Sequence, residues 1–278
     1  MPDQPNCKAK RLDLSSPRIM GILNVTPDSF SDGGQFDRLD DALRHAERLV
    51  REGADILDIG GESTRPGAQA VGEAEEIDRV GPVIDAIASR IEVPISIDTS
   101  KAEVMRAAVQ AGACMLNDVN ALRAEGALEA AASLDVPVCL MHMQGEPRTM
   151  QQEPYYQDVV TEVGDFLQQR AAACEAAGIP RDRIVLDPGF GFGKTLAHNL
   201  ALLQALPCLV DRGYPVLVGL SRKSMLGKIT GRGVGQRLAG SLAVALLALQ
   251  GGSAILRVHD VAETLDVLKI WQAVSARG

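Results

Sequence analysis

The chain has 278 residues, 46% of them hydrophobic, which is enough apolar material for one large α/β domain or two small ones. Its net charge of −8 argues against a general nucleic-acid binder and against a membrane-surface protein, because both need a basic face. No apolar run reaches the roughly 20 residues of a membrane span. The five cysteines form no C-x-x-C pair, which argues against zinc and redox motifs. We therefore expect a reduced, cytoplasmic protein.

Short apolar runs alternate with amphipathic patterns along the whole chain. The apolar runs are bounded by Gly, Pro or polar residues, which is typical of strands buried on both faces. They predict strands at Ile19–Asn24, Ile56–Gly60, Pro94–Asp98, Met115–Asp118, Val136–Met141, Ile184–Asp187, Val216–Gly219 and Ala254–Val258. The amphipathic patterns predict helices at Leu39–Glu52, Glu73–Arg90, Lys101–Ala111, Glu125–Leu134, Tyr156–Ala177, Ala197–Ala205, Gln236–Gln250 and Asp260–Ser275. Ser100 is the predicted N-cap of the third helix.

Eight strand–helix units without a break in composition predict one α/β domain, a (β/α)8 TIM barrel. An open, doubly wound sheet is the alternative architecture. We place the barrel in residues 18–278 and interpret residues 1–17 as an N-terminal extension. Active sites of such barrels lie where the strands end, so the residues at the strand ends are the candidates for a functional site.

Three predicted strands carry hydrogen-bonding groups suited to a planar heterocycle. Asp98 ends the third strand, Asn117 lies near the end of the fourth, and Asp187 ends the sixth. A carboxylate accepts two N–H bonds from a guanidinium-like edge, and an amide both donates and accepts. A 2-amino-4-oxopyrimidine, as in a pterin or guanine, presents such an edge. For either aspartate alone, a buried salt bridge is the alternative.

Basic residues are expected at the same mouth of the barrel. They come from the loops after the second, seventh and eighth strands and are Arg65, Arg222, Lys223, Arg257 and His259. On an acidic chain, a local basic cluster indicates an anionic ligand. The helix that starts at Asp260 adds N–H groups, and barrels commonly hold phosphate after strands seven and eight. The alternative is a solvated basic rim.

The sixth strand continues into a glycine-rich segment, Pro188–Lys194, in which three glycines alternate with Phe190 and Phe192. Glycines let backbone N–H groups approach a ligand, and the rings supply flat apolar surface. The segment therefore predicts a loop that holds a planar and a charged group. An ordinary strand-to-helix turn has a similar sequence, so the pattern alone is weak.

Two further strand ends bear on metals. Asn24 could offer one oxygen to a magnesium ion, and such an ion would arrive mostly on a phosphate ligand because few carboxylates lie beside it. His142 stands between two methionines, Met141 and Met143. A single imidazole there is more typical of a pocket wall than of a copper site.

Several of these segments resemble signatures of one family. Met20–Gly33 closely resembles the first signature of the dihydropteroate synthases, the folate-synthesis enzymes that sulfonamides inhibit, and Gly60–Gly67 resembles the second. Asp187–Lys194, Ser221–Ser224 and Arg257–Asp260 match in the same order. The resemblance implies a pterin-binding barrel, a homodimer, and a transferase that joins 6-hydroxymethyl-7,8-dihydropterin pyrophosphate to 4-aminobenzoate. The products are 7,8-dihydropteroate and pyrophosphate.

The resemblance also assigns roles to residues, position by position. The residues that resemble the pterin-holding set are Asp98, Asn117, Asp187 and Lys223. Those that resemble the pyrophosphate and Mg²⁺ site are Asn24, Arg257 and His259. Those on the 4-aminobenzoate side are Thr64, Arg65, Pro66, Phe192, Lys223 and Ser224. The residues expected to act in catalysis are Arg257, His259, Lys223 and Asp98.

Two other functions are weighed against the synthase. A pterin-dependent methyltransferase also holds a pterin in a barrel, but it does not need Arg257 with His259 or the loop Ser63–Gly67. A non-catalytic pterin-binding homologue is expected to have lost part of the first two loops, and both are intact here. The sequence therefore favours the synthase.

Overall fold

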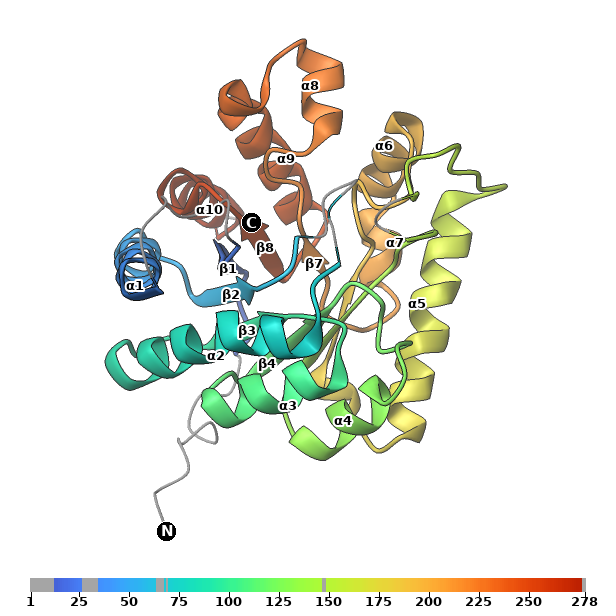
Figure 1. The fold of residues 1–278 in the computed structure, drawn as a ribbon. Coiled ribbons are helices and arrows are strands. Elements are labelled where there is room, and N and C mark those ends of the chain that lie inside the picture. Colours follow the sequence, from blue (N-terminus) through green and yellow to red (C-terminus); the bar gives the residue numbers. More distant parts are fainter. Residues whose placement is uncertain (1–12, 27–34, 64–67, 69, 147–148, 277–278) are drawn as a thin grey trace.

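The computed structural model describes residues 13–26, 35–63, 68, 70–146 and 149–276 (Figure 1). The strands within these residues are β1 (Arg18–Asn24), β2 (Ile56–Gly60), β3 (Ile95–Asp98), β4 (Met115–Asp118), β5 (Val138–Met141), β6 (Ile184–Asp187), β7 (Leu217–Val218) and β8 (Ile255–Val258). The α-helices are α1 (Gln35–Arg51), α2 (Glu73–Arg90), α3 (Ala102–Ala111), α4 (Ala127–Leu134), α5 (Val159–Ala176), α6 (Leu196–Gln204), α7 (Leu206–Val210), α8 (Ser224–Thr230), α9 (Leu238–Gln250) and α10 (Val261–Ser275).

The parallel strands form one closed ring. The sheet runs β6-β5-β4-β3-β2-β1-β8-β7, and a parallel bridge between Leu186 and Val216 joins its two ends. The amide of Leu186 donates to the carbonyl of Pro215 at 2.9 Å. The helices lie outside the strands (Figure 1). The closed ring confirms the predicted single-domain (β/α)8 barrel and excludes the open, doubly wound sheet.

Side chains along each strand alternate between the inside of the barrel and the surrounding helices. The inward side chains near the amino ends of the strands form an apolar cluster, here called the apolar floor: Met20, Ile56, Met115, Cys139, Val185, Leu217 and Ile255. Neighbours such as Leu57, Leu116 and Leu256 belong instead to the larger core. Leu14 packs against the floor. The predicted domain boundary after residue 17 stays a prediction.

Several helix starts differ from the prediction, and α1 begins four residues before the predicted Leu39, at Gln35. Two of the differences have a side-chain cause. Ser100 is not an N-cap, because its hydroxyl donates to the buried carboxylate of Asp118 and Lys101 takes the cap position. Helix α5 begins at Val159 and not at Tyr156, because the carboxylate of Asp158 accepts the first free amides of the helix. The short helices α7 and α8 were not predicted. None of the helices in the described ranges is long and apolar enough to cross a membrane.

Candidate active site

Polar side chains line the inside of the barrel beyond the apolar floor. Because side chains on a strand alternate with a period of two, each polar residue lies two positions after a buried inward residue, as Asp58 does after Ile56. We call this set the polar layer: Asp58, Asp98, Asn117, Asp187 and Arg257. Asp98 and Asn117 are register partners on β3 and β4. The strands thus bring together the pterin-type residues predicted from the sequence.

Arg257 is ion-paired to two carboxylates of the polar layer. Its Nε donates to Asp58 Oδ2 at 2.6 Å, and its Nη2 donates to Asp98 Oδ2 at 2.8 Å. Asn117 Nδ2 also donates to Asp58 Oδ2, at 3.2 Å. Burial favours the neutral form of the guanidinium, but the two carboxylates outweigh it and raise the pKa of Arg257 overall. A guanidinium has five N–H groups, and the two ion pairs use two of them.

Asp58 is a polar residue near the end of the second predicted strand to which the sequence analysis assigns no role. Its side chain is fully buried, and Oδ1 has no hydrogen-bond partner among the described residues. An unpaired buried carboxylate oxygen is costly, so a donor that reached this atom would stabilise it. Asp58 lies between Leu57 and Ile59 inside an apolar run. The signal was the charged residue within a buried strand, at the same inward phase as Arg257.

The glycine-rich segment after β6 contributes Asp187 and Phe192. Asp187 is buried, its Oδ1 accepts the amide of Gly189 at 2.7 Å, and burial raises the pKa of its carboxyl. Lys223 Nζ lies 4.1 Å from the centre of the Phe192 ring. Burial and the charge of Arg257 lower the pKa of Lys223 to about 8. This wall therefore presents an acceptor, a flat apolar ring and a cation.

His142 packs against the glycine-rich segment. The side chain is buried, and its Nδ1 lies 2.9 Å from Nζ of Lys194, which the glycine-rich segment also buries. Burial and the neighbouring Lys194 lower the pKa of His142 to about 3, so the ring is neutral. The sequence does not reveal this contact, because the two residues are 52 positions apart.

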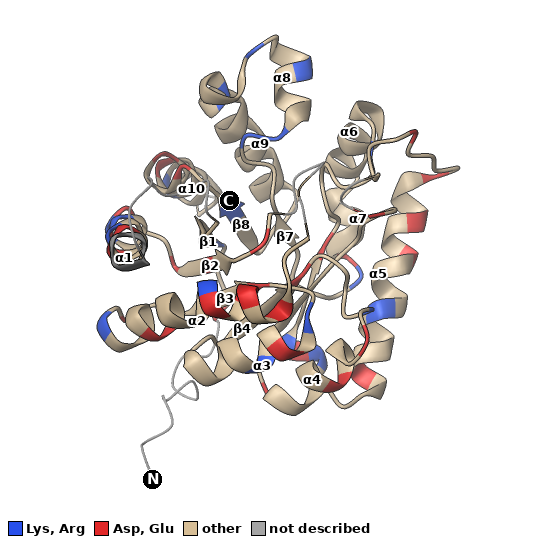
Figure 2. Cartoon of the chain, viewed as in Figure 1, with Lys and Arg blue, Asp and Glu red and all other residues tan. Residues whose placement is uncertain are grey.

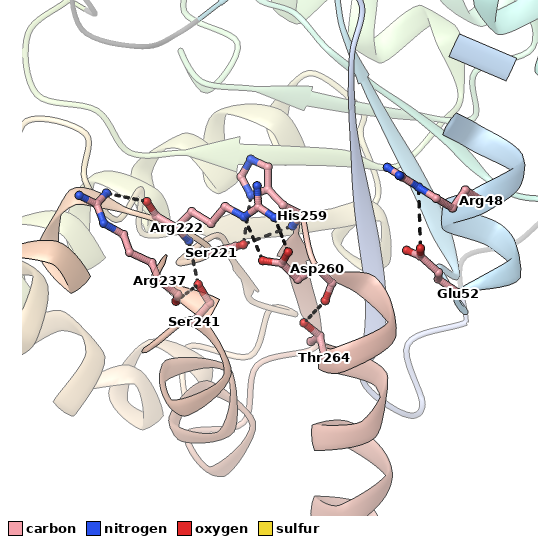
Figure 3. A network of polar contacts seen from close by, with 9 residues as sticks. All are labelled: Arg48, Glu52, Ser221, Arg222, Arg237, Ser241, His259, Asp260 and Thr264. Atoms are coloured by element: carbon pink, nitrogen blue, oxygen red, sulfur yellow. Dashed lines mark hydrogen bonds and ion pairs between the residues drawn. The ribbon is translucent and has the colours of Figure 1, made fainter. Parts of the chain in front are cut away.

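Residues at the ends of β7 and β8 form a polar network (Figure 3). Ser221 Oγ accepts the amide of His259 at 3.2 Å and lies 3.1 Å from its Nδ1. The Arg222 guanidinium is bound to the carboxylate of Asp260, with Nε 3.0 Å from Oδ2. Arg222 has φ 57, and Arg237 and Ser241 hold its backbone carbonyl and amide. Such strain persists only where surrounding contacts enforce it.

The basic character of this region is carried by one segment. From residue 222 to residue 259 the chain contains six Lys or Arg residues and no Asp or Glu. Figure 2 shows these basic residues on β8 and around α8. Carboxylates outside the segment pair with two of these six residues, Arg222 and Arg257. The other four add positive charge to a chain whose net charge is −8, and such a local excess attracts anions.

Known proteins resemble this chain over nearly its whole length. The family model described as "Pterin binding enzyme" matches residues 20–259. The dihydropteroate synthase of Haemophilus influenzae is 56% identical over 266 residues, which cover 96% of this chain and 97% of that protein. This chain belongs to the dihydropteroate synthase family.

Solved structures of the family superpose closely on the chain. Dihydropteroate synthase of Xanthomonas albilineans with 4-aminobenzoic acid gives a TM-score of 0.92 at 57% identity, covering 98% of this chain and 97% of that one. The same enzyme in complex with 7,8-dihydropteroate gives a TM-score of 0.89 at 54% identity, covering 98% of both chains. The family membership therefore extends over the whole barrel.

The structure describes some of the remaining predicted site residues and not others. Asn24 ends β1, is half-buried and lies at the same end of the barrel as the polar layer. Ser224 is exposed and is the first residue of α8. Thr64, Arg65 and Pro66 lie outside the described residues. Their family roles stay predictions, as do those of the other site residues.

A cavity of about 490 Å³ opens beside the polar layer, and Asp98 is part of its lining. Glu62, Glu76 and Lys101 line it as well, and the Lys101 ammonium is bound to both glutamates. Glu62 lies at the base of the second loop, where its Oε1 accepts the amide of Val71. Lys101 therefore fastens this loop to α3, a role that the sequence analysis did not find.

The titration of Asp98 leads to a prediction about pH. Burial raises the pKa of Asp98 to about 7, against the opposing charge of Arg257. Only the ionised carboxylate accepts two N–H bonds, so pterin affinity should fall by up to about tenfold per pH unit below 7. Calorimetric titration of a pterin between about pH 5 and pH 8 checks this, with Asp98→Asn as the matched control that should show a flat profile. An equally steep profile in Asp98→Asn would assign the titration to another group.

The raised pKa of Asp98 also makes the free energy of unfolding depend on pH. Between the unfolded pKa near 4 and the folded value, the native state binds more protons than the unfolded chain. The contribution of Asp98 to the free energy of unfolding is therefore fully present below pH 4 and is lost as the pH rises towards 7.

Proposed function

We propose that this protein condenses 6-hydroxymethyl-7,8-dihydropterin pyrophosphate with 4-aminobenzoate to give 7,8-dihydropteroate and pyrophosphate. The observation that carries the proposal is the meeting of two sets in one barrel mouth. Carboxylates and an amide of the polar layer suit the pterin edge, and the acid-free segment from Arg222 to His259 suits the pyrophosphate. The family relatives with bound 4-aminobenzoic acid and 7,8-dihydropteroate support it.

In this proposal the polar layer binds the pterin. The carboxylates of Asp98 and Asp187 accept the ring N–H groups, and Asn117 completes the mixed edge. Lys223 supplies a donor, and its pKa of about 8 leaves it mostly protonated near neutral pH. Arg257 orients Asp98 through its ion pair. Most of the rate enhancement then comes from positioning and fixed charges.

In the reaction the bond between the exocyclic carbon and the pyrophosphate oxygen breaks, and the aryl amine forms the new C–N bond and loses one proton. No enzyme nucleophile is needed. Arg257 and His259 face the departing charge, and the amino end of α10 adds N–H groups. Phe192 and Ser224, with Thr64, Arg65 and Pro66 of the second loop, are the proposed contacts of 4-aminobenzoate.

Magnesium is the proposed metal. Among the residues that the structure describes, no group of three or more His, Cys, Asp or Glu side chains is arranged to hold a metal by itself. The amide oxygen of Asn24 is a hard ligand at the right end of β1, and this fits an ion held mainly by phosphate oxygens. When bound, Mg²⁺ would neutralise part of the pyrophosphate charge.

The test of the function is release of pyrophosphate with dihydropterin pyrophosphate, Mg²⁺ and 4-aminobenzoate. We expect release that requires both substrates and yields a product with the mass of 7,8-dihydropteroate. Pterin binding without release would instead support a non-catalytic homologue. Methyl transfer from a methylated pterin, without pyrophosphate release, would support a methyltransferase.

We also propose a homodimer in the cytoplasm. Exposed apolar side chains lie on the neighbouring helices α9 and α10: Leu246, Leu247, Ile270 and Val274. Exposed apolar groups of this kind often mark an interface. The described cysteines are free thiols, which suits a reducing compartment.

The dimer leads to a prediction of its own. Changing Leu247 and Ile270 together to Glu should convert the dimer to monomer, because two charges would be buried in the interface. Sedimentation velocity at micromolar protein checks this. The control is the pair Leu200→Glu and Ile229→Glu, which replaces exposed apolar residues on α6 and α8. A wild-type monomer, or a dimer that both variants keep, would contradict the proposal.

A further inference from the structure

Lys194 is a buried charged residue to which the proposed mechanism gives no role. Its side chain is 3% exposed, and its ammonium is surrounded by backbone carbonyls. Nζ lies 2.9 Å from Gly189 O, 3.0 Å from Phe192 O and 3.3 Å from His142 O. It also lies 2.9 Å from His142 Nδ1. An ammonium has three protons, and all of them can be donated inside the protein.

The imidazole of His142 is suited to accept one of these protons. Burial and the Lys194 charge lower the pKa of His142 to about 3, so the ring is neutral. A neutral ring next to an ammonium accepts through Nδ1 and carries its own proton on Nε2. Burial lowers the pKa of Lys194 to about 7, while Asp187 opposes this shift and Lys223 adds to it. The carbonyls and the imidazole thus offset part of the cost of burying this charge.

The contacts of Lys194 join two strands at the barrel mouth. His142 directly follows β5, and Gly189–Phe192 follows β6. The backbones approach closely here: a Cβ atom on Gly189, which has φ +67, would lie 1.9 Å from His142 O. The turn brings the carbonyls of His142, Gly189 and Phe192 to one point, where the Lys194 ammonium donates to them. The Gly189 carbonyl also accepts the amide of Phe192, at 3.1 Å.

The same turn carries two groups of the proposed substrate site. The amide of Gly189 donates to Asp187 Oδ1 at 2.7 Å, while its carbonyl accepts from Lys194. The carbonyl of Phe192 is also held by Lys194, and the Phe192 ring lies under Lys223. The Lys194 ammonium therefore holds the carbonyl of Gly189, whose amide binds the pterin acceptor Asp187. It also holds the carbonyl of Phe192, the residue that carries the apolar ring.

We propose that Lys194 is a positioning residue of this enzyme. Held by His142, it fixes the turn Gly189–Phe192 so that Asp187 and Phe192 face the substrates at the same time. The proposal rests on the proposed function, because it takes the pterin as the ligand of Asp187. It assigns Lys194 no contact with substrate. This role differs from the roles proposed for Arg257, which lies on β8, and for His259, which directly follows that strand.

The experiment compares Lys194→Met with wild type and with Lys269→Met, an exposed lysine on α10 that serves as control. Calorimetry measures binding of 6-hydroxymethylpterin, and a separate titration measures binding of pyrophosphate with Mg²⁺. We expect the dissociation constant for the pterin to rise at least tenfold and the KM for 4-aminobenzoate to rise severalfold. Pyrophosphate binding should stay within about twofold, and Lys269→Met should match wild type.

A second variant covers the case in which Lys194→Met does not fold. His142→Asn keeps the lysine and its carbonyls but moves one acceptor. The dissociation constant for the pterin should therefore rise threefold to fivefold, while that for pyrophosphate should stay nearly unchanged. Pterin binding that is unchanged in the folded variants would overturn the proposal. Equal losses of pterin and pyrophosphate binding would show a general structural role and overturn it too. Failure of the function itself would appear separately, as wild-type protein that binds pterin but releases no pyrophosphate.

Discussion

Replacing Arg257 with Met should lower kcat/KM by about 10³-fold, because one guanidinium serves two purposes. It is ion-paired to Asp58 and Asp98, and in the proposed function it stabilises the departing pyrophosphate. Removing it leaves the fully buried Asp58 without its cation, which should cost on the order of 3 kcal/mol of unfolding free energy. Initial-rate assays of pyrophosphate release and urea denaturation measure the two effects.

A double variant separates stability from catalysis. Asp58→Asn combined with Arg257→Met removes the uncompensated charge, so most of the lost stability should return while activity stays low. The sequence alone predicts that turnover falls more than pterin affinity. The ion pair to Asp98 adds an expected loss of affinity, because the pterin acceptor loses its orienting partner. Unchanged stability in Arg257→Met would contradict the two ion pairs, and unchanged turnover would contradict the catalytic role.

Asp187→Asn should weaken pterin binding by roughly 10- to 150-fold. A hydrogen bond to a charged group contributes about 1.5–3 kcal/mol, and the amide can accept only through one oxygen. Unfolding free energy should change by less than about 1 kcal/mol, because the new Oδ1 can still accept the amide of Gly189. Calorimetry with 6-hydroxymethylpterin and denaturation in urea are the measurements.

Asp118→Asn is the matched control for this prediction. Asp118 is also buried at a strand end, but its oxygens accept from the Ser100 hydroxyl and from the amides of Asn120 and Leu122. It should lose stability and keep pterin affinity within about threefold. Equal pterin affinity in Asp187→Asn and wild type would remove Asp187 from the pterin site, even if the enzyme remained active.

The parts of the fold that follow from local physics were predicted from the sequence. Apolar runs locate the strands, and because parallel strands end at one mouth, the sequence places Asp98, Asn117 and Asp187 together. It assigns Arg257 to a separate basic cluster, whereas the structure pairs Arg257 with Asp98. Closure of the barrel depends on the contact of β6 with β7. The sequence predicts this contact only indirectly, through the repetition of eight strand–helix units. The short helices α7 and α8 were missed because they lie in connections without a long amphipathic period.

The errors concern partners that are distant in the chain. Arg222 was grouped with free basic residues, yet its guanidinium is bound to Asp260, 38 positions later. Lys194 was described only as the end of a glycine-rich segment, although its burial against His142 gives that segment its shape. Composition and spacing identify which groups a strand delivers. They do not identify which of those groups neutralise one another.

The apolar floor has a consequence for covalent chemistry. Cys139 is one of its side chains, is fully buried, and has a thiol whose pKa is raised by burial. Electrophiles and oxidants react with the thiolate, so the folded barrel protects this cysteine, whereas Cys208 is exposed. A reagent can reach Cys139 only after strands part, and the polar layer two residues further along the same strands parts with them. An adduct at Cys139 would therefore hold the barrel in an opened, inactive form. The rate at which Cys139 is labelled would then measure how often the barrel opens.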